Sequence, residues 1–200
     1  TWYDPTFDPD LSGFEARVRA VRPKVVGLYG HTVTRPVAKR MVRLCRELGC
    51  RVVAGGPDPV QYPDEYLDAG VEVLVVGEGE ITLTELMHHL RDRDWALDEG
   101  ALSDIQGIIF RREGALVRTA PRPLIKPLDR LPWPRRDRHD MGRYVEAWRK
   151  RHGRTALSIS TSRGCPFSCT WCSKQVYGDT FRRRPVSDVI DAADEALYRA

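Results

Sequence analysis

Three cysteines lie close together in the stretch TSRGCPFSCTWCS, residues 161–173. Cys165, Cys169 and Cys172 follow a C-x3-C-x2-C spacing. Spacings of four and three would allow one helix face, but a glycine and a proline flank the first cysteine and favour a loop that wraps around a ligand. The stretch follows a predicted strand, at the kind of edge where α/β proteins place their active sites. The pattern therefore predicts a metal or catalytic site.

The number of thiols restricts the kind of metal site. A structural zinc ion takes four closed ligands, and the chain offers poor candidates for a fourth, since His152 precedes the predicted strand and Cys45 and Cys50 belong to another unit. Iron–sulfur clusters also take four ligands, but three thiolates leave one iron open to a substrate, which suits catalysis. A catalytic iron–sulfur cluster, a zinc site and a fortuitous trio of cysteines remain as alternatives.

Composition excludes several classes of protein. The chain has 200 residues, 42% hydrophobic and 30% charged, which is typical of a globular protein of one to two domains and not of a disordered or fibrous one. Its formal charge of +4, from 32 basic and 28 acidic residues, is too balanced to indicate a nucleic-acid partner. We expect a fragment at both ends, because the sequence begins with Thr1 and stops at Ala200 inside a helical pattern.

The location follows from the cysteines and from the lack of targeting signals. Five cysteines in a chain of this length do not make a disulfide scaffold, and their clustering indicates a reducing compartment. No apolar run approaches the roughly 18 residues of a membrane span, and the N-terminus lacks a signal-peptide pattern. The sequence thus predicts a cytoplasmic protein without a membrane span.

The first 90 residues alternate between strand and helix signals, the pattern of a parallel sheet with crossover helices. Ser12 and Glu15 have the spacing of a capping box at the start of the first helix. The apolar run 24–29 suits a strand buried on both faces. The pattern predicts strands at 24–29, 51–54 and 72–76, and helices at 12–21, from Pro36 to about residue 48, from Pro63, and at 81–90.

The second half of the chain changes character. Residues 107–120 contain two β-rich runs around a Glu-Gly turn, hence a hairpin, and the Pro- and Arg-rich residues 121–137 predict an extended linker. A strand at 155–161, the cysteine loop and a helix at 186–197 then form a second strand–helix unit. We therefore expect three parts: an α/β domain at 1–100, hairpin and linker at 101–150, and a further α/β unit at 151–200.

Three small-residue loops follow the three predicted strands, at 30–36, 55–63 and 77–80. In an open parallel sheet they share the carboxyl edge, where ligands bind, and glycines there let a ligand approach the backbone. Tight turns explain such glycines equally well. No dinucleotide fingerprint or phosphate loop is present. The candidate binding residues at this edge are Tyr29, Gly30, His31, Gly55, Gly56, Pro57, Gly77, Glu78, Gly79 and Glu80.

The stretch GCPFSCTWCS, with the aromatic Trp171 before its last cysteine, resembles the cluster loop of radical S-adenosylmethionine enzymes, and residues 181–197 resemble the passage from that loop into the first barrel helix. The resemblance implies that Cys165, Cys169 and Cys172 bind a 4Fe-4S cluster at the start of a (β/α) barrel. It also implies that the open iron chelates S-adenosylmethionine, which reduction cleaves to a 5′-deoxyadenosyl radical, and that Trp171 packs near the adenine.

The stretches PKVVGLYG, VVAGGPDPVQYPDEYLDAGVEVLVVGEGE and LDRLPWPRRD resemble the flavodoxin-like, cobalamin-binding-type domain that precedes many radical S-adenosylmethionine barrels. The sequence departs from this family in two respects. A first strand and helix before residue 10 are not found, and the Asp-x-His-x-x-Gly loop would lie in that missing unit. His31 lacks the Asp and Gly partners of that loop, so it is not predicted to bind cobalt, and an ordinary loop histidine is the favoured interpretation.

Several other residues are given simpler interpretations. His88 and His89 are predicted to be solvated on a surface helix, and Cys45 to lie in the core. The basic runs RRRP and PRRDR are predicted to be solvated or to pair with carboxylates of a barrel outside this sequence.

The leading hypothesis from these resemblances is a radical S-adenosylmethionine enzyme that transfers a methyl group from cobalamin to an unactivated carbon. Its cofactors would be a 4Fe-4S cluster, S-adenosylmethionine and cobalamin. Its partners would be a small-molecule or peptide substrate and an external one-electron reductant of the flavodoxin or ferredoxin type. Two alternatives stay open: a radical enzyme whose first domain binds no cobalamin, and a non-catalytic zinc- or cluster-binding module. No catalytic side chain is assigned.

Overall fold

A computed structural model describes residues 1–136, 140–172, 174 and 176–198 of the protein. The chain divides into two compact units. One comprises Pro5–Leu124 with Thr170–Gly178, and the other Thr1–Asp4, Ile125–Cys169 and Asp179–Ala200. Among the described residues, no helix has the length and apolar character that crossing a membrane requires.

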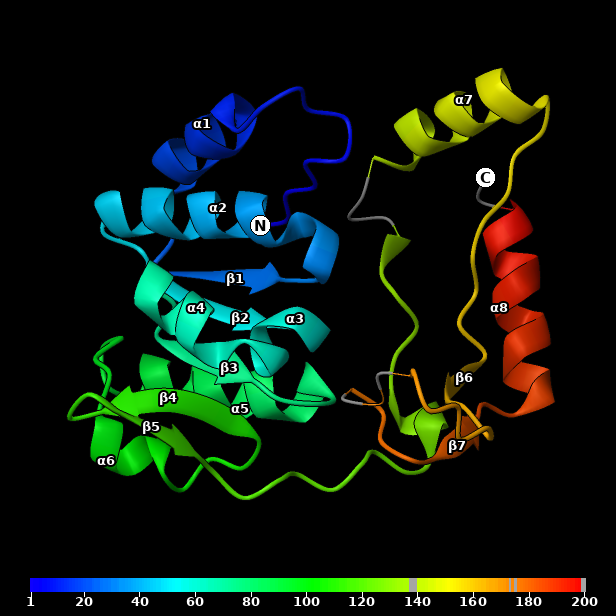
Figure 1. Cartoon of the computed structure of the whole chain (residues 1–200). Helices are drawn as coiled ribbons and strands as arrows, with labels where there is room; N and C mark the ends of the chain where they lie inside the picture. Colours follow the sequence, from blue (N-terminus) through cyan, green and yellow to red (C-terminus); the bar gives the residue numbers. More distant parts are fainter. Residues whose placement is uncertain (137–139, 173, 175, 199–200) are drawn as a thin grey trace. The chain divides into compact units, whose positions relative to one another are not determined.

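The larger unit is built on a mixed five-stranded sheet, whose strands follow one another from β1 to β5 in Figure 1. The first three are parallel, which confirms the expected βα series. The predicted hairpin also forms, and its first strand pairs antiparallel with β3, an addition to the sheet that the sequence did not predict. The strands are β1 (Val25–Tyr29), β2 (Arg51–Gly55), β3 (Val73–Val75), β4 (Ile108–Arg112) and β5 (Ala115–Arg118).

Helices connect the strands of this unit. The four predicted helices are present, and the two short helices α3 and α6 and the 3-10 turn η1 were not predicted. The helical elements are α1 (Ser12–Val21), η1 (Thr32–Thr34), α2 (Arg35–Glu47), α3 (Pro57–Gln61), α4 (Pro63–Ala69), α5 (Gly79–Arg91) and α6 (Glu99–Leu102).

The start of α1 differs from the predicted capping box. Leu11 occupies the N-cap position, Ser12 is the first helical residue, and no side chain of the N-cap residue caps the helix. The backbone N–H of Ser12 instead donates to Oδ1 of Asp10 over 2.8 Å. The prediction was wrong because the acidic residue two positions upstream satisfies a free N–H of the first turn, as a capping side chain would.

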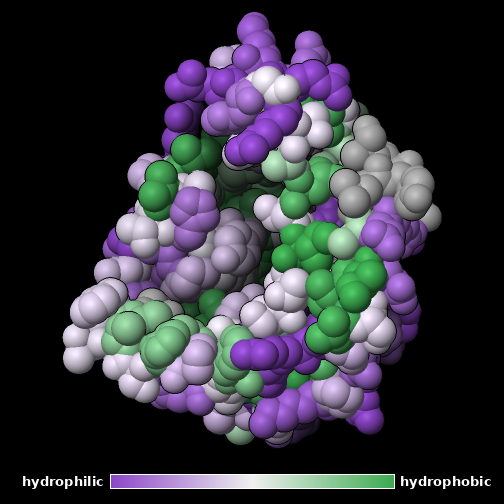
Figure 2. Space-filling model, turned by 90° about the vertical axis from the view of Figure 1, so that its right-hand side faces the viewer, coloured by the Kyte–Doolittle hydropathy of each residue, from purple (hydrophilic) through white to green (hydrophobic). Residues whose placement is uncertain are grey.

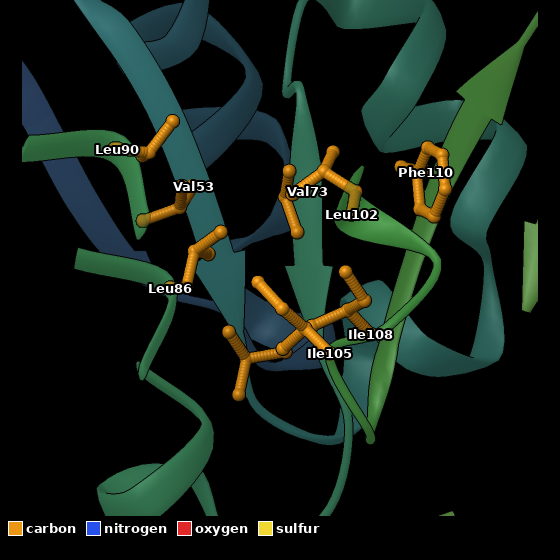
Figure 3. Packing of buried hydrophobic residues seen from close by; sticks show 9 residues of the cluster. Val53, Val73, Leu86, Leu90, Leu102, Ile105, Ile108 and Phe110 are labelled. Atoms are coloured by element: carbon orange, nitrogen blue, oxygen red, sulfur yellow. The ribbon is translucent and has the colours of Figure 1, made fainter. Parts of the chain in front are cut away.

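The main hydrophobic core lies between one face of the sheet and α5 and α6. The register aligns Val53, Val73 and Phe110 across three strands, so that alternate residues point to the same face. Figure 3 shows these side chains converging with leucines of α5 and α6. The buried cluster comprises Val53, Val73, Val75, Leu86, Leu90, Leu102, Ile105, Ile108 and Phe110.

The opposite face of the sheet is covered by α2 and α4, and α1 packs on α2. This face buries the alternate strand residues Val52, Ala54, Leu74 and Ile109. By contrast, β1 is partly exposed along its length, so the prediction of a strand buried on both faces was wrong. The reason is position, because β1 has a single strand neighbour and lies at the end of the described sheet.

The second unit contains little regular structure apart from two long helices. The predicted helix near residue 186 is confirmed, whereas the sequence did not predict the helix that begins at Met141. Of the predicted linker, residue 137 lies outside the described residues, and residues 121–136 are mostly without regular structure, as expected, with a short turn at Leu128–Arg130. The elements are η2 (Leu128–Arg130), α7 (Met141–His152), β6 (Ser162–Gly164), β7 (Phe181–Arg183) and α8 (Val186–Tyr198).

The strand predicted at residues 155–161 is not observed. This stretch is irregular, and a three-residue strand, β6, follows it at Ser162–Gly164. The physical reason is pairing: β6 has a ladder partner in β7, whereas residues 155–160 pair with no strand in the described part of the chain. Beta propensity alone therefore misplaced this strand.

The surface on the side of α7 and α8 carries exposed apolar side chains. Figure 2 shows hydrophobic surface (green) in patches among hydrophilic surface (purple). On α8, Val186 is 75% exposed and Ile190 is 54% exposed. Single exposed apolar side chains are normal for a protein surface, so they carry no assignment by themselves.

The position of the hairpin in the core can be tested by mutation. Phe110→Ala should lower the free energy of unfolding of the larger unit by roughly 3 to 5 kcal/mol, because Phe110 is completely buried between the sheet and its helices. Leu116→Ala, on the partner strand and 39% exposed, is the matched control and should cost less than about 1 kcal/mol. Urea unfolding measures both. Equal effects would mean that the hairpin contributes nothing to this core.

Candidate functional site

The carboxyl ends of β1 and β2 bring the predicted edge residues together. The register pairs Tyr29 with Gly55, and the N–H of Gly30 donates to the carbonyl oxygen of Gly55 over 2.8 Å. The next strand ends beside them, where Gly55 pairs with Val75. Gly30, Gly55 and Gly56 therefore form one continuous backbone surface, as the parallel pattern predicts.

Two glycines at this edge are required by the loops themselves. Gly56 has a φ of 101°, and a Cβ there would lie 2.4 Å from the carbonyl oxygen of Gly30. A Cβ on Gly30 would lie 2.7 Å from Cγ of Pro59 and 3.0 Å from the Tyr66 hydroxyl. Internal packing therefore explains both glycines without a ligand, in agreement with the interpretation that they serve tight turns.

The loop after β3 differs from the expected four-residue turn. Gly77 has a φ of 72° and forms the turn, whereas Gly79 and Glu80 already belong to α5. Glu78 precedes that helix and is 6% exposed, and Glu80 is exposed. The edge therefore offers one buried and one exposed carboxylate, two residues apart in sequence.

A buried polar network that sequence analysis missed lies behind the edge. The Asp58 carboxylate accepts from Nε of Arg35 over 2.8 Å, from Nη2 of Arg35 over 2.6 Å and from the Tyr66 hydroxyl over 2.8 Å. The Arg35 guanidinium also lies 3.8 Å from the ring centre of Tyr62. The network ties the loop after β1 to the loop after β2. A sequence signal was available in Asp58, which lies between two prolines at a helix start.

The electrostatics of this network follow from its geometry. Hydrogen bonds from the Arg35 guanidinium lower the pKa of the Asp58 carboxyl, against the opposing effect of burial. The bond to Asp58 raises the pKa of Arg35. Burial, followed by the hydrogen bond to Asp58, raises the pKa of the Tyr66 hydroxyl. Asp58 is thus held as a carboxylate and Tyr66 as a neutral donor.

The outer surface of the edge is apolar in part. Tyr29 is 71% exposed at the end of β1, and Val33, in the turn that follows, is 84% exposed. His31 is exposed as well, and the hydroxyl of Thr34 donates to its carbonyl oxygen over 3.0 Å. Accessible apolar side chains beside open backbone fit a large ligand with an apolar face, such as a corrin ring.

The cysteine loop is closed at its base by the pairing of β6 with β7. The N–H of Cys165 donates to the carbonyl oxygen of Thr180 over 2.9 Å. Gly164 has a φ of 83°, and a Cβ there would lie 1.7 Å from the same oxygen, so only glycine fits. The pairing of β6 with β7 next to Gly164 therefore fixes the backbone of Cys165.

All three cysteines of the loop are free and exposed. Cys165 and Cys169 belong to one unit and Cys172 to the other. Within the described residues, no three His, Cys, Asp or Glu side chains are grouped closely enough to hold a metal ion. The chemistry of the donors, three accessible soft thiols, fits an iron–sulfur cluster, and the ligand assignment stays a prediction. Trp171 is 86% exposed, so its role near an adenine also stays a prediction.

Two simpler predictions can be compared with the structure. Cys45 is fully buried in the core, as expected, and burial raises the pKa of its thiol to about 12. His88 is exposed as predicted, but His89 is only partly exposed, and its Nε2 is buried without a hydrogen-bond partner in the described part of the chain. Burial, followed by Arg93, lowers the pKa of the His89 ring. The prediction of a solvated His89 was therefore wrong.

Removal of the Asp58 carboxylate should weaken the fold in a pH-dependent way. Because the folded-state pKa of Asp58 is lowered, its stabilisation is present above the ordinary carboxyl pKa of about 4 and is lost as the pH falls further. Asp58→Asn should therefore lower the free energy of unfolding by about 3 kcal/mol at pH 7, and by less at pH 3. Urea unfolding at both pH values checks this. Asp64→Asn, an exposed partner of Arg111, is the control, and an equal loss in both variants would contradict the prediction.

Comparison with known proteins supports the assignment of this unit. The family model of the B12 binding domain matches residues 3–87. An uncharacterized methyltransferase from Pyrococcus horikoshii is 31% identical over 189 residues, which cover 92% of this chain and 36% of that protein. An anaerobic magnesium-protoporphyrin IX monomethyl ester cyclase from Synechocystis sp. is 30% identical over 193 residues, with the same two shares, 92% and 36%.

Solved structures share the fold. TsrM from Kitasatospora setae, a radical S-adenosylmethionine methyltransferase with a tryptophan substrate and a SAM analog bound, superposes with a TM-score of 0.74 at 22% identity, covering 98% of this chain and 39% of that one. A structure of TsrM with cobalamin and a 4Fe-4S cluster gives 0.71 at 23% identity, covering 94% and 38%.

The chain spans little more than a third of the length of these proteins. The B12-binding match covers residues 3–87, whereas the curated relatives and the solved structures match almost the whole chain. Residues 3–87 therefore match the B12 binding domain, and almost the whole chain is similar to proteins named as a methyltransferase and a cyclase and shares the fold of TsrM.

Proposed function

We propose that the protein is a radical S-adenosylmethionine enzyme that transfers a methyl group to an unactivated carbon with the help of cobalamin. The observation that carries the proposal is the presence, in one chain, of three exposed thiols at C-x3-C-x2-C spacing after a B12-binding domain. A 4Fe-4S cluster with an open iron would bind S-adenosylmethionine, and its reduction would supply the 5′-deoxyadenosyl radical.

The three cysteines would act as thiolates. Cys165, Cys169 and Cys172 are exposed, so iron can reach all three sulfur atoms. Only the position of Cys165 is constrained by a described hydrogen bond of its own backbone, at the β6–β7 pair. The other two thiols lie on a segment without regular structure, which suits a loop that adapts to its ligand.

The carboxyl edge would hold the cobalamin. Tyr29 and Val33 offer exposed apolar surface there, and Gly55 and Gly56 are partly exposed at the same edge. His31 would not need to bind cobalt, because its ring is exposed and it lacks the partners of the Asp-x-His-x-x-Gly loop. The network of Arg35, Asp58 and Tyr66 would hold the two loops in place beneath the ligand.

The other partners follow from this chemistry. A one-electron reductant of the flavodoxin or ferredoxin type would reduce the cluster, and the substrate would be a small molecule or a peptide. Such chemistry belongs in a reducing compartment, which for this protein would be the cytoplasm.

One observation favours a second candidate, a radical enzyme whose B12-binding-type domain holds no corrinoid. The packing of Pro59, Tyr66 and Tyr29 against Gly30 and Gly56 explains these glycines without any ligand. In that case the domain would serve for docking, and the radical would be used for cyclisation or other chemistry.

Replacement of one cysteine tests the cluster. After anaerobic reconstitution, we expect about four irons per chain and a brown chromophore, and Cys172→Ser should lose most of both, because one of three thiolate ligands is gone. Ser168→Ala, in the same loop, is the matched control and should keep the cluster. Metal analysis showing zinc but no iron in the unaltered protein would instead favour a zinc-binding module.

Electron paramagnetic resonance tests the open iron. The reduced cluster should give a signal that shifts when S-adenosylmethionine is added, since the amino and carboxylate groups of that ligand would enter the coordination sphere of the iron. A cluster whose signal does not change on this addition would contradict the proposed cleavage chemistry, while leaving the cysteine ligands in place.

A surface substitution tests the cobalamin site. Tyr29→Ala should weaken cobalamin binding about tenfold, because a large exposed aromatic side chain that would cover the corrin is removed without disturbing the core. Leu116→Ala, exposed near the opposite end of the sheet, is the control. Corrinoid absorbance after equilibrium dialysis measures both. The absence of cobalamin binding by the unaltered protein would favour the second candidate.

A further inference from the structure

The short strand β7 contains consecutive arginines that point in alternate directions. Arg182 is 8% exposed, whereas Arg183 is exposed, as the two-residue period of a strand requires. Arg184 follows the strand and is partly buried. The sequence-based interpretation of this run as solvated or paired with distant carboxylates was therefore wrong for Arg182.

Arg182 binds the backbone of the linker. Its Nη1 donates to the carbonyl oxygen of Ile125 over 2.7 Å, and its Nε donates to the hydroxyl of Thr180 over 3.3 Å. The Ile125 side chain is itself 7% exposed. A hydrogen bond from a charged donor is stronger than one between neutral groups, so this contact fixes residue 125 against the strand.

Arg184 binds the same linker further along. Its Nη1 donates to the carbonyl oxygen of Leu131 over 3.0 Å and its Nη2 to that of Pro132 over 3.5 Å. Its guanidinium also lies 4.1 Å from the ring centre of Trp133. Proline-rich backbone has carbonyl acceptors but few N–H donors, so it cannot extend a sheet, and arginine donors take the place of strand pairing.

The strand that carries these arginines also closes the cysteine loop. The carbonyl oxygen of Thr180, directly before β7, accepts a hydrogen bond from the N–H of Cys165. The two backbones approach so closely that a Cβ on Gly164 would clash with the same oxygen. A shift of β7 would therefore move the backbone of Cys165. The linker contacts and the first cysteine are joined through a single strand of three residues.

We propose that Arg182 and Arg184 are positioning residues for the cluster loop: by clamping residues 125–133 to β7, they hold the backbone of Cys165 where its thiolate can bind the cluster. This inference rests on the proposed function, because it assigns the cluster to the three cysteines. Arg183 is exposed, its guanidinium lies 4.7 Å from the ring centre of Phe181, and it has no part in the clamp.

Two variants and a matched control test the clamp in the reconstituted protein. Arg184→Gln removes the contacts to the linker from a partly exposed site, and Arg182→Lys keeps the charge but loses the paired donors. Arg183→Gln removes the same charge from the exposed side of the strand. We expect the two clamp variants to lose iron to a chelator about tenfold faster than the unaltered protein, and Arg183→Gln to match it.

Hydrogen–deuterium exchange of the peptide containing residues 162–165 gives a readout that needs no cluster. The clamp variants should exchange about tenfold faster there, with unchanged exchange in the core strands β2 and β3, which a general loss of stability would not produce. Unchanged exchange at residues 162–165 would overturn the clamp, and faster exchange without faster iron loss would overturn its role in positioning the cysteine. A protein that binds no iron before any substitution would overturn the proposed function, whichever way the exchange experiment turned out.

Discussion

Parallel pairing of β1, β2 and β3 is the constraint on which the candidate ligand site depends. Because the three strands run in one direction, the loops that follow them share one edge, and the hydrogen bond between Gly30 and Gly55 joins two of these loops directly. The buried carboxylate of Asp58 then fixes the same two loops from behind. The candidate ligand edge is thus made largely of backbone, and the Asp58 network keeps that backbone in place.

The larger unit could be predicted from the sequence to a considerable extent. Apolar runs gave the parallel strands, and the proline and glycine positions marked the helices near Pro36 and Pro63. Burial was harder to predict, because the apolar run of β1 looks the same in the sequence whether it has one strand neighbour or two. Long-range polar contacts were not predicted at all, since nothing local in Arg35 indicates a partner 23 residues away.

The second unit shows the opposite balance. The cysteine spacing could be interpreted directly, but the strand before it was placed several residues too early, because pairing with β7 and not propensity decides where β6 forms. The arginine run was also misinterpreted. Charged residues in a row usually indicate solvated surface, whereas Arg182 points inward and donates to the carbonyl oxygen of Ile125 in the extended linker. Such acceptors carry no signal in the sequence, because every residue has a carbonyl.

The hairpin β4–β5 determines the edge at which the chain leaves the sheet, because each antiparallel strand reverses the direction of the chain. A single antiparallel strand after β3 would release the chain at the amino edge, whereas two strands return it to the carboxyl edge. Residues 119 and 120 accordingly lie beside Ile108 and Gly107, and Arg122 is then tied to Thr82 of α5 over 2.8 Å. The linker therefore begins at the edge that carries Gly30 and Gly56. Because the number of added strands is even, the chain leaves the sheet at the same edge that carries the candidate ligand surface.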